Sequence, residues 1–142
     1  MSVYVSPYVV LDVDTSIYTS GDALGAVFQI PNVPEHGTIM SINVLDHDSE
    51  NDNLDVYFFK ASIAETSENG AFSPTDAEME NCLGAVLVDT WKVQEDNGLG
   101  VVDNVGLPYW APEGILYCQA VTRGTPTYTA VTDIEVSVGI VY

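Results

Sequence analysis

The sequence predicts an all-β protein, a two-sheet antiparallel sandwich of the jelly-roll type with one short helical turn. Apolar and polar residues alternate with period 2 along the whole chain, whereas the 3.6-residue period of amphipathic helices is almost absent. Clusters of Gly, Pro, Asn, Asp and Ser interrupt this alternation at short intervals, as they do between sandwich strands. The composition does not change along the 142 residues, so we expect one domain over residues 1–142.

Eight segments show the alternation expected of strands. In chain order they are residues 8–13, 25–30, 38–45, 54–61, 85–93, 99–105, 115–122 and 134–142. The last is the clearest, because Ile134, Val136 and Val138 fall on one face while Glu135 and Ser137 fall on the other. An immunoglobulin-like sandwich remains the alternative, but eight strands favour the jelly roll.

Turn-forming residues separate the segments. They occupy residues 20–22, 31–37, 46–53, 95–98, 106–114 and 123–129, where Gly, Pro, Asn and Asp favour reversal of the chain. Residues 73–81 are the one stretch expected to be helical. Ser73 can cap this turn, Pro74 suits its first helical position, and three acidic residues place negative charge near its N-terminus.

The charge of the chain is strongly negative. Three basic residues stand against 21 acidic ones, which gives a net charge of −18. A nucleic-acid partner is excluded, because Lys and Arg must neutralise phosphates. An anionic membrane surface is disfavoured for the same reason, and no apolar run approaches the ~20 residues of a membrane-spanning helix. A hydrophobic content of 46% separates this acidic chain from disordered ones.

The start of the chain lacks the basic and apolar regions of a secretory signal, so we expect synthesis and folding in the cytoplasm. In that reducing compartment Cys82 and Cys118 are expected to stay free thiols. Cys82 follows an acidic turn that raises the pKa of its thiol, and Cys118 has the position of a small core residue. No cofactor is expected.

Catalytic and metal-binding patterns are weak. Both histidines, His36 and His47, fall in turns, and neither a nucleophile triad nor a phosphate-binding glycine loop is present. Residues 46–55 alternate carboxylates as a calcium loop does, but Asn51 and Tyr57 stand where an EF-hand needs Gly and a bidentate Glu. A hydrated loop is favoured for these residues, and a cation site is the alternative. We therefore expect no metal and no catalytic residues.

Aromatic residues and the single arginine are the candidates for contacts. Tyr109 and Trp110 lie between Pro108 and Pro112 in a predicted loop, where packing within the loop and contact with a partner are equally expected. Arg123 is the one arginine of an acidic chain, so a carboxylate partner is expected. A partner within the chain, fixing a turn, is favoured over a partner across an interface.

Three stretches carry a family resemblance. Residues 14–25 read DTSIYTSGDALG, residues 72–80 read FSPTDAEME, and residues 121–128 read VTRGTPTY, followed by Asp133 and a closing strand. Together they resemble the head decoration or cement proteins of tailed bacteriophages. The resemblance implies a non-enzymatic virion protein, commonly a trimer, that binds the major capsid protein on the outer head surface and stabilises contacts between capsomers.

The contact surfaces of such an oligomer should be poor in Asp and Glu, because the copies repel one another elsewhere. Strand 134–142 and segment 3–10 are the expected edges for pairing with another chain. The candidate interface residues are Tyr4, Tyr8, Tyr109, Trp110, Arg123 and Tyr142. The alternative function is a sugar- or receptor-binding sandwich of a tail or baseplate, and an acidic hydrolase ranks third.

Overall fold

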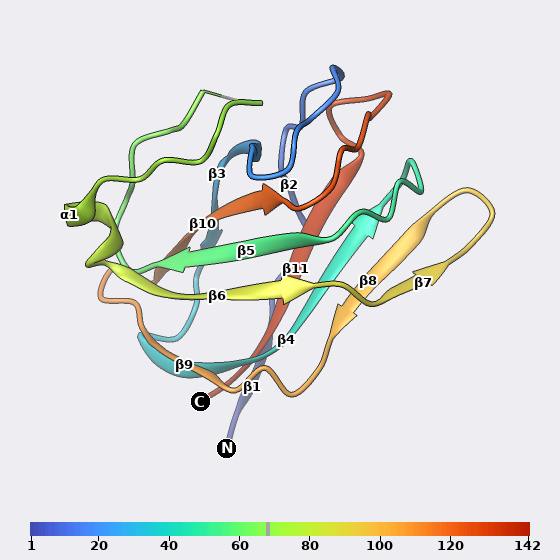
Figure 1. Cartoon of the computed structure of the whole chain (residues 1–142). Helices are drawn as coiled ribbons and strands as arrows, with labels where there is room; N and C mark the ends of the chain where they lie inside the picture. The colour runs from blue at the N-terminus through green and yellow to red at the C-terminus, as the bar shows by residue number, and fades with distance from the viewer. Residues whose placement is uncertain (68) are drawn as a thin grey trace.

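The protein consists of two antiparallel β-sheets packed face to face (Figure 1). The structure is a computed structural model, and it describes residues 1–67 and 69–142. The prediction of an all-β sandwich with one short helical turn is confirmed. In the described residues the larger sheet contains β1 (Val3–Val5), β2 (Val9–Val10), β4 (His36–Asp46), β7 (Trp91–Val93), β8 (Gly98–Val102), β9 (Leu107–Trp110) and β11 (Ile134–Val141). The smaller sheet contains β3 (Ala23–Pro31), β5 (Leu54–Phe59), β6 (Cys82–Val88) and β10 (Ile115–Thr122).

The connections between the strands are those of a jelly roll. The larger sheet has the order β1-β11-β4-β8-β7, with β2 also paired to β11 and β9 to β4, and the smaller sheet has the order β3-β10-β5-β6. The chain passes from one sheet to the other at most of its connections, and β5–β6 and β7–β8 are hairpins within one sheet (Figure 1). This alternation brings β11, at the end of the chain, between β1 and β4.

The core lies between the two sheets. The alternation predicted for the last strand is confirmed, because Ile134, Val136, Val138 and Ile140 are all buried there. Phe58 of β5 faces them from the smaller sheet and is also fully buried. Each such side chain contributes on the order of 1.5–3 kcal/mol by leaving water.

Several predicted boundaries were wrong. Residues 85–93 form two strands in different sheets, β6 and β7, with a break at Asp89 and Thr90. The predicted turn 106–114 contains β9, and the predicted strand 8–13 is regular only over β2. The C-terminal strand was expected at an edge, but β11 pairs on both sides. Period-2 alternation marks extended residues without saying which strand lies beside which, and this explains these errors.

The helical turn α1 spans Asp76–Met79. Its N-cap is Thr75, not Ser73, and Pro74 therefore precedes the cap instead of filling the first helical position. The Thr75 hydroxyl accepts the backbone N–H of Glu78, and the Glu78 carboxylate accepts the backbone N–H of Thr75. This reciprocal capping box places the start of the helix two residues later than expected.

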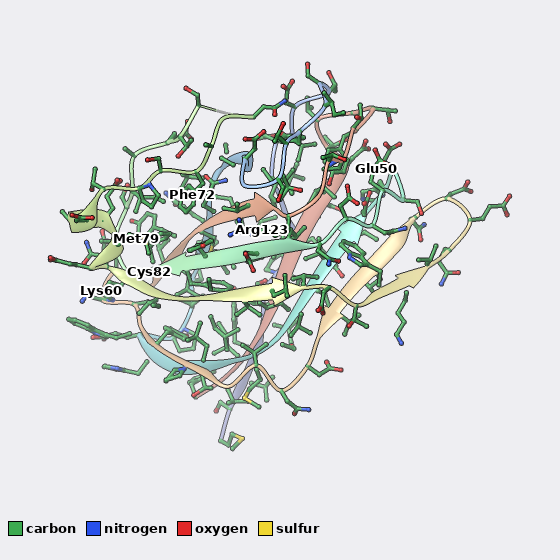
Figure 2. The ribbon with its side chains drawn as sticks, viewed as in Figure 1. Glu50, Lys60, Phe72, Met79, Cys82 and Arg123 are labelled. Atoms are coloured by element: carbon green, nitrogen blue, oxygen red, sulfur yellow. The ribbon has the colours of Figure 1, made fainter. Side chains whose placement is uncertain are left out.

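The outer faces of the two sheets differ. A second apolar cluster covers part of the outer face of the smaller sheet, where Ile63 and Phe72 from the segment after β5 join Phe59 and Tyr117. Figure 2 shows the position of Phe72. In the described residues no comparable cluster lies over the outer face of the larger sheet. The outer side chains of the larger sheet are therefore mostly half-buried or exposed, apart from Ser137, which Ser6 covers.

Candidate interaction surface

The outer face of the larger sheet is built by strand register. Asn43 of β4 lies opposite Ser137 of β11 and Val101 of β8, and side chains paired in this way point to the same face. The same register places Val141 beside Val3. We call this surface the neutral face; it comprises Val3, Val5, Thr38, Ser41, Asn43, Leu45, Leu99, Val101, Pro108, Trp110 and Val141.

The neutral face carries almost no net charge. By register its charged neighbours are Glu135, opposite Leu45, and Lys92, opposite Leu99. Glu35 and Lys60 both contact Trp110, so each pair of neighbours has opposite signs. The Glu135 carboxylate also lies 2.8 Å from Nε2 of His47. In a chain with 21 acidic residues, this distribution leaves one side of the sandwich free of the repulsion that the rest of the surface exerts on an acidic partner.

Trp110 lies at one end of this face. Its side chain is 45% exposed, its ring stacks on His36 with centroids 6.4 Å apart, and Nζ of Lys60 lies 5.3 Å from the ring centroid. The indole N–H reaches the Glu35 carboxylate at 3.5 Å. Trp110 is therefore an exposed aromatic residue whose ring already contacts one cation and one imidazole.

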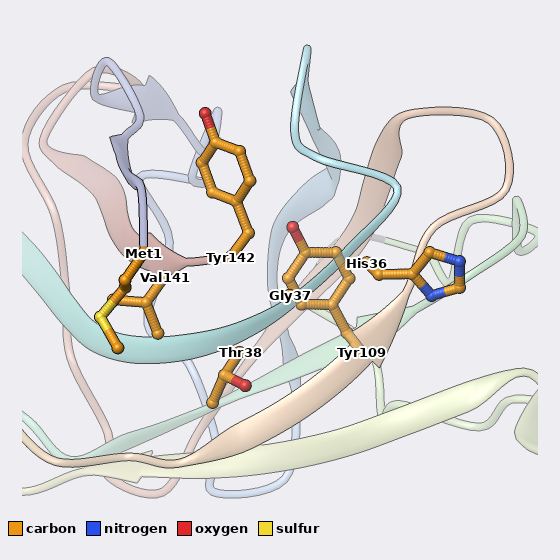
Figure 3. A pocket seen from close by; sticks show the side chains of 7 residues that line it. All are labelled: Met1, His36, Gly37, Thr38, Tyr109, Val141 and Tyr142. Atoms are coloured by element: carbon orange, nitrogen blue, oxygen red, sulfur yellow. The ribbon is translucent and has the colours of Figure 1, made fainter.

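An open hollow of about 540 Å³ adjoins this end of the neutral face (Figure 3). It is lined by Met1, His36, Gly37, Thr38, Tyr109, Val141 and Tyr142. The ring of Tyr142 is 55% exposed at its margin. The lining is mostly apolar, which suits contact with another surface better than the positioning of a reacting group.

Tyr109 and Trp110, for which packing and contact with a partner were equally expected, differ from each other in the structure. Both residues belong to β9, so their side chains point to opposite faces, and Tyr109 is only 6% exposed. Its hydroxyl donates to the carbonyl of Pro34 at 2.8 Å, and burial raises the pKa of the phenol to about 12. Tyr109 thus supports the hollow from inside, whereas Trp110 faces outward.

The other tyrosines of the predicted interface lie in two places. Tyr4 packs against the core, and its hydroxyl donates to the carbonyl of Pro31 at 3.1 Å. Tyr8 is 41% exposed; burial, and then the charge of Glu135, raises the pKa of its phenol. The structure therefore gathers Tyr4, Tyr109, Trp110 and Tyr142 towards one end of the larger sheet and leaves Tyr8 farther along the edge.

Arg123 lies on the other sheet, beside β5 (Figure 2). Its Nε donates to Oδ2 of Asp55 at 2.6 Å, and the hydroxyl of Tyr57 lies 3.5 Å from its guanidinium. The backbone N–H of Arg123 also donates to the carbonyl of Asn53. The expected carboxylate partner within the chain is present, and this contact holds the end of β10 to β5.

Replacing Arg123 with alanine is expected to lower the free energy of unfolding by about 1 kcal/mol, since the ion pair is partly exposed and screened by solvent. Thermal unfolding of the isolated protein measures this loss. Arg123→Lys should restore part of it, because an ammonium keeps the charge but not the planar geometry. Unchanged stability combined with weaker assembly would instead place Arg123 in an interface.

The acidic loop after β4 is held by its own carboxylates. Asp46 is fully buried and accepts the backbone N–H groups of Asp48 and Asn51, both at 2.9 Å. Burial raises the pKa of Asp46, although these N–H groups act in the opposite direction. Glu50 accepts the backbone N–H of Thr127 at 2.6 Å. Asp48 accepts the hydroxyl of Thr129 at 3.0 Å, so these carboxylates tie the loop to the segment before β11. In the described residues no three His, Cys, Asp or Glu side chains gather as metal ligands.

The two cysteines are free. Cys118 is buried in the main core, as expected, and burial holds the pKa of its thiol well above the ordinary value. The pKa of the Cys82 thiol is also raised, but the main cause is burial and not the neighbouring acidic turn. Neither thiol is activated as a nucleophile.

Comparison with protein-family models, curated proteins and solved structures found no match. In the part of the chain that the structure describes, no helix has the length and apolar character needed to cross a bilayer. The neutral face is the feature that sequence reasoning missed. The sequence pattern that could have revealed it is the scarcity of acidic residues in segments 38–45, 99–105 and 134–142. Of the 21 acidic residues of the chain, these segments contain Asp103 and Glu135.

Proposed function

We propose that this chain is a non-enzymatic structural protein of a virion, a capsid decoration or cement protein that binds the major capsid protein on the outer head surface. The observation that carries the proposal is the neutral face of the larger sheet in a chain of net charge −18. A bare sheet face without net charge can pack against another subunit without bringing unpaired carboxylates into the contact.

The rest of the surface fits the same role. The acidic loops stay in solvent, where their charge keeps many copies soluble before assembly and repels the packaged nucleic acid. Jelly rolls also occur in viral capsid and lectin domains, which is support at the level of fold alone. The family resemblance adds a homo-oligomer, with a trimer as the expected form on the head.

The test is attachment to capsids. Purified protein is added to phage heads stripped of their auxiliary proteins, and the bound fraction is measured by co-sedimentation and by the temperature at which the heads open. We expect saturable binding and more heat-resistant heads. Absence of binding to heads from the virus that encodes the chain would contradict the proposal.

A sugar- or receptor-binding module of a tail or baseplate is the second candidate, because Trp110 is exposed beside the open hollow. It ranks second since His36 and Lys60 already contact the indole ring and reduce the aromatic surface left for a sugar. Binding to a glycan array that disappears in Trp110→Ala would favour this candidate over capsid attachment.

A further inference from the structure

The free side of β1 is an unpaired strand edge. Among the described residues β1 pairs with β11 alone. Ser2 exchanges both backbone hydrogen bonds with Tyr142, and the N–H of Ser6 donates to the carbonyl of Val138. Since antiparallel strands alternate between bonded and non-bonded pairs, the N–H and C=O groups of Val3 and Val5 point away from β11.

In the described residues, three other strand edges are interrupted or occupied. Edge strand β7 has Lys92 at its centre and is followed by Glu95. Edge strand β6 has a break in register at Gly84. Along β3 the N–H of Ala26 already donates to the carbonyl of Leu11. Charges, bulges and covering segments of this kind are how proteins prevent pairing at an edge.

None of these protections is present on β1. Residues 1–11 include no charged side chain, and Val3 and Val5 are each 67% exposed. β-Branched residues favour extended backbone and pair well across strands. The strand is therefore ready to accept a further strand.

We propose that β1 pairs antiparallel with β1 of a second copy of this chain, about a two-fold axis that passes next to Tyr4. In this register Val3 of one copy faces Val5 of the other, and the outward backbone groups of both pairs exchange hydrogen bonds. The exposed valine side chains of the two copies then lie side by side on the outer face. The larger sheets join into one sheet, and the two neutral faces become continuous.

The symmetry of the contact identifies a second copy as the occupant. Two chains of net charge −18 repel each other over most of their surfaces. The uncharged β1 edge and the neutral face beside it are where two copies can approach without placing carboxylates against each other. Because the contact is self-complementary, one strand provides both halves of it.

This inference does not depend on attachment to a capsid. A two-fold contact closes as a dimer, with a mass twice the 15.3 kDa of the chain. The trimer that the family resemblance implies would need a contact between two different surfaces. The mass of the free protein in solution therefore distinguishes the two arrangements.

The test is sedimentation equilibrium of the free protein at increasing concentration, with Val5→Pro as the variant. Proline removes the outward N–H of residue 5, but no hydrogen bond to β11, and its φ suits an edge strand. We expect a monomer–dimer equilibrium that Val5→Pro weakens roughly tenfold or more, since each copy loses one hydrogen bond. The matched control Val5→Thr keeps the N–H and the β-branched shape and should dimerise like the original chain.

If thermal unfolding shows that Val5→Pro does not fold, Val5→Glu replaces it. The new carboxylate adds one like charge to each copy next to the axis, so dimerisation should weaken at low salt and recover in part at high salt. A free protein that is monomeric at every concentration, a trimer, or a dimer equally stable in these variants would overturn the inference. Since no heads are used, each of these results leaves capsid attachment to its own test.

Discussion

Asn43→Asp is expected to weaken attachment to heads roughly tenfold to a hundredfold, because it places an unpaired charge in the middle of the neutral face. Asn43 is in the central strand of that face, between Ser137 and Val101. The change replaces an amide by a carboxylate of nearly the same shape, so packing within the sheet is unaffected. Desolvation of a charge without a partner costs about 1–3 kcal/mol, which corresponds to this loss of affinity.

Asn104→Asp is the matched control. Asn104 is exposed in the link between β8 and β9, next to Asp103 and outside the neutral face. Both variants gain one negative charge, so general repulsion from the head changes equally. Co-sedimentation should show near-normal binding for Asn104→Asp and weak binding for Asn43→Asp, with similar thermal unfolding. Equal affinities would mean that the neutral face is not the surface that attaches.

Gly25→Ala should lower the free energy of unfolding by about 3 kcal/mol and the melting temperature by roughly 10 °C. Gly25 has a φ of +75°, and a Cβ built on it would overlap the carbonyl oxygen of Leu11. That carbonyl accepts the N–H of Ala26 at 2.8 Å, which fastens β3 to the segment after β2. Alanine therefore adds both backbone strain and a collision with a fixed backbone atom.

Gly106→Ala separates the two contributions. Gly106 also has a positive φ, +68°, but no atom lies within 4 Å of its would-be Cβ. The strain alone should cost about 1 kcal/mol. Thermal unfolding of the two variants under the same conditions gives the difference, which we attribute to the Leu11 carbonyl. Equal losses would show that the backbone at Gly25 moves aside without cost.

Much of the fold was predictable, because a strand with one buried face shows an alternation of apolar and polar residues in the sequence. The inward residues of β11 alternate in the sequence as they do in the core, and the number of alternating segments favoured the jelly-roll class. A carboxylate partner for Arg123 was expected because of charge, and a partner within the chain was favoured because such contacts often fix turns. Strand β9 was not predicted, because its four residues contain a proline and follow a glycine, which are typical of turns.

The candidate surface was less predictable, because it depends on neighbours far apart in the sequence. Tyr109 and Trp110 are adjacent in the chain, yet one is buried and the other exposed, since β9 pairs with β4. Asn43 and Val101 became part of one surface only through the register of β4 and β8. Sequence reasoning favoured conspicuous aromatic side chains, while the neutral face is defined by the charges that it lacks.

The amino-acid sequence by itself determined the extended segments with one apolar side and the strongly acidic character of the remaining residues. The tertiary structure alone decided that β11 is internal, that β1 is an open edge, and that an apolar cluster covers part of the smaller sheet's outer face. The physical reason is the distance along the sequence between the residues that interact. Alternation and charge are properties of neighbouring residues, whereas edges and faces arise from pairing between segments that the sequence separates by as many as a hundred residues or more.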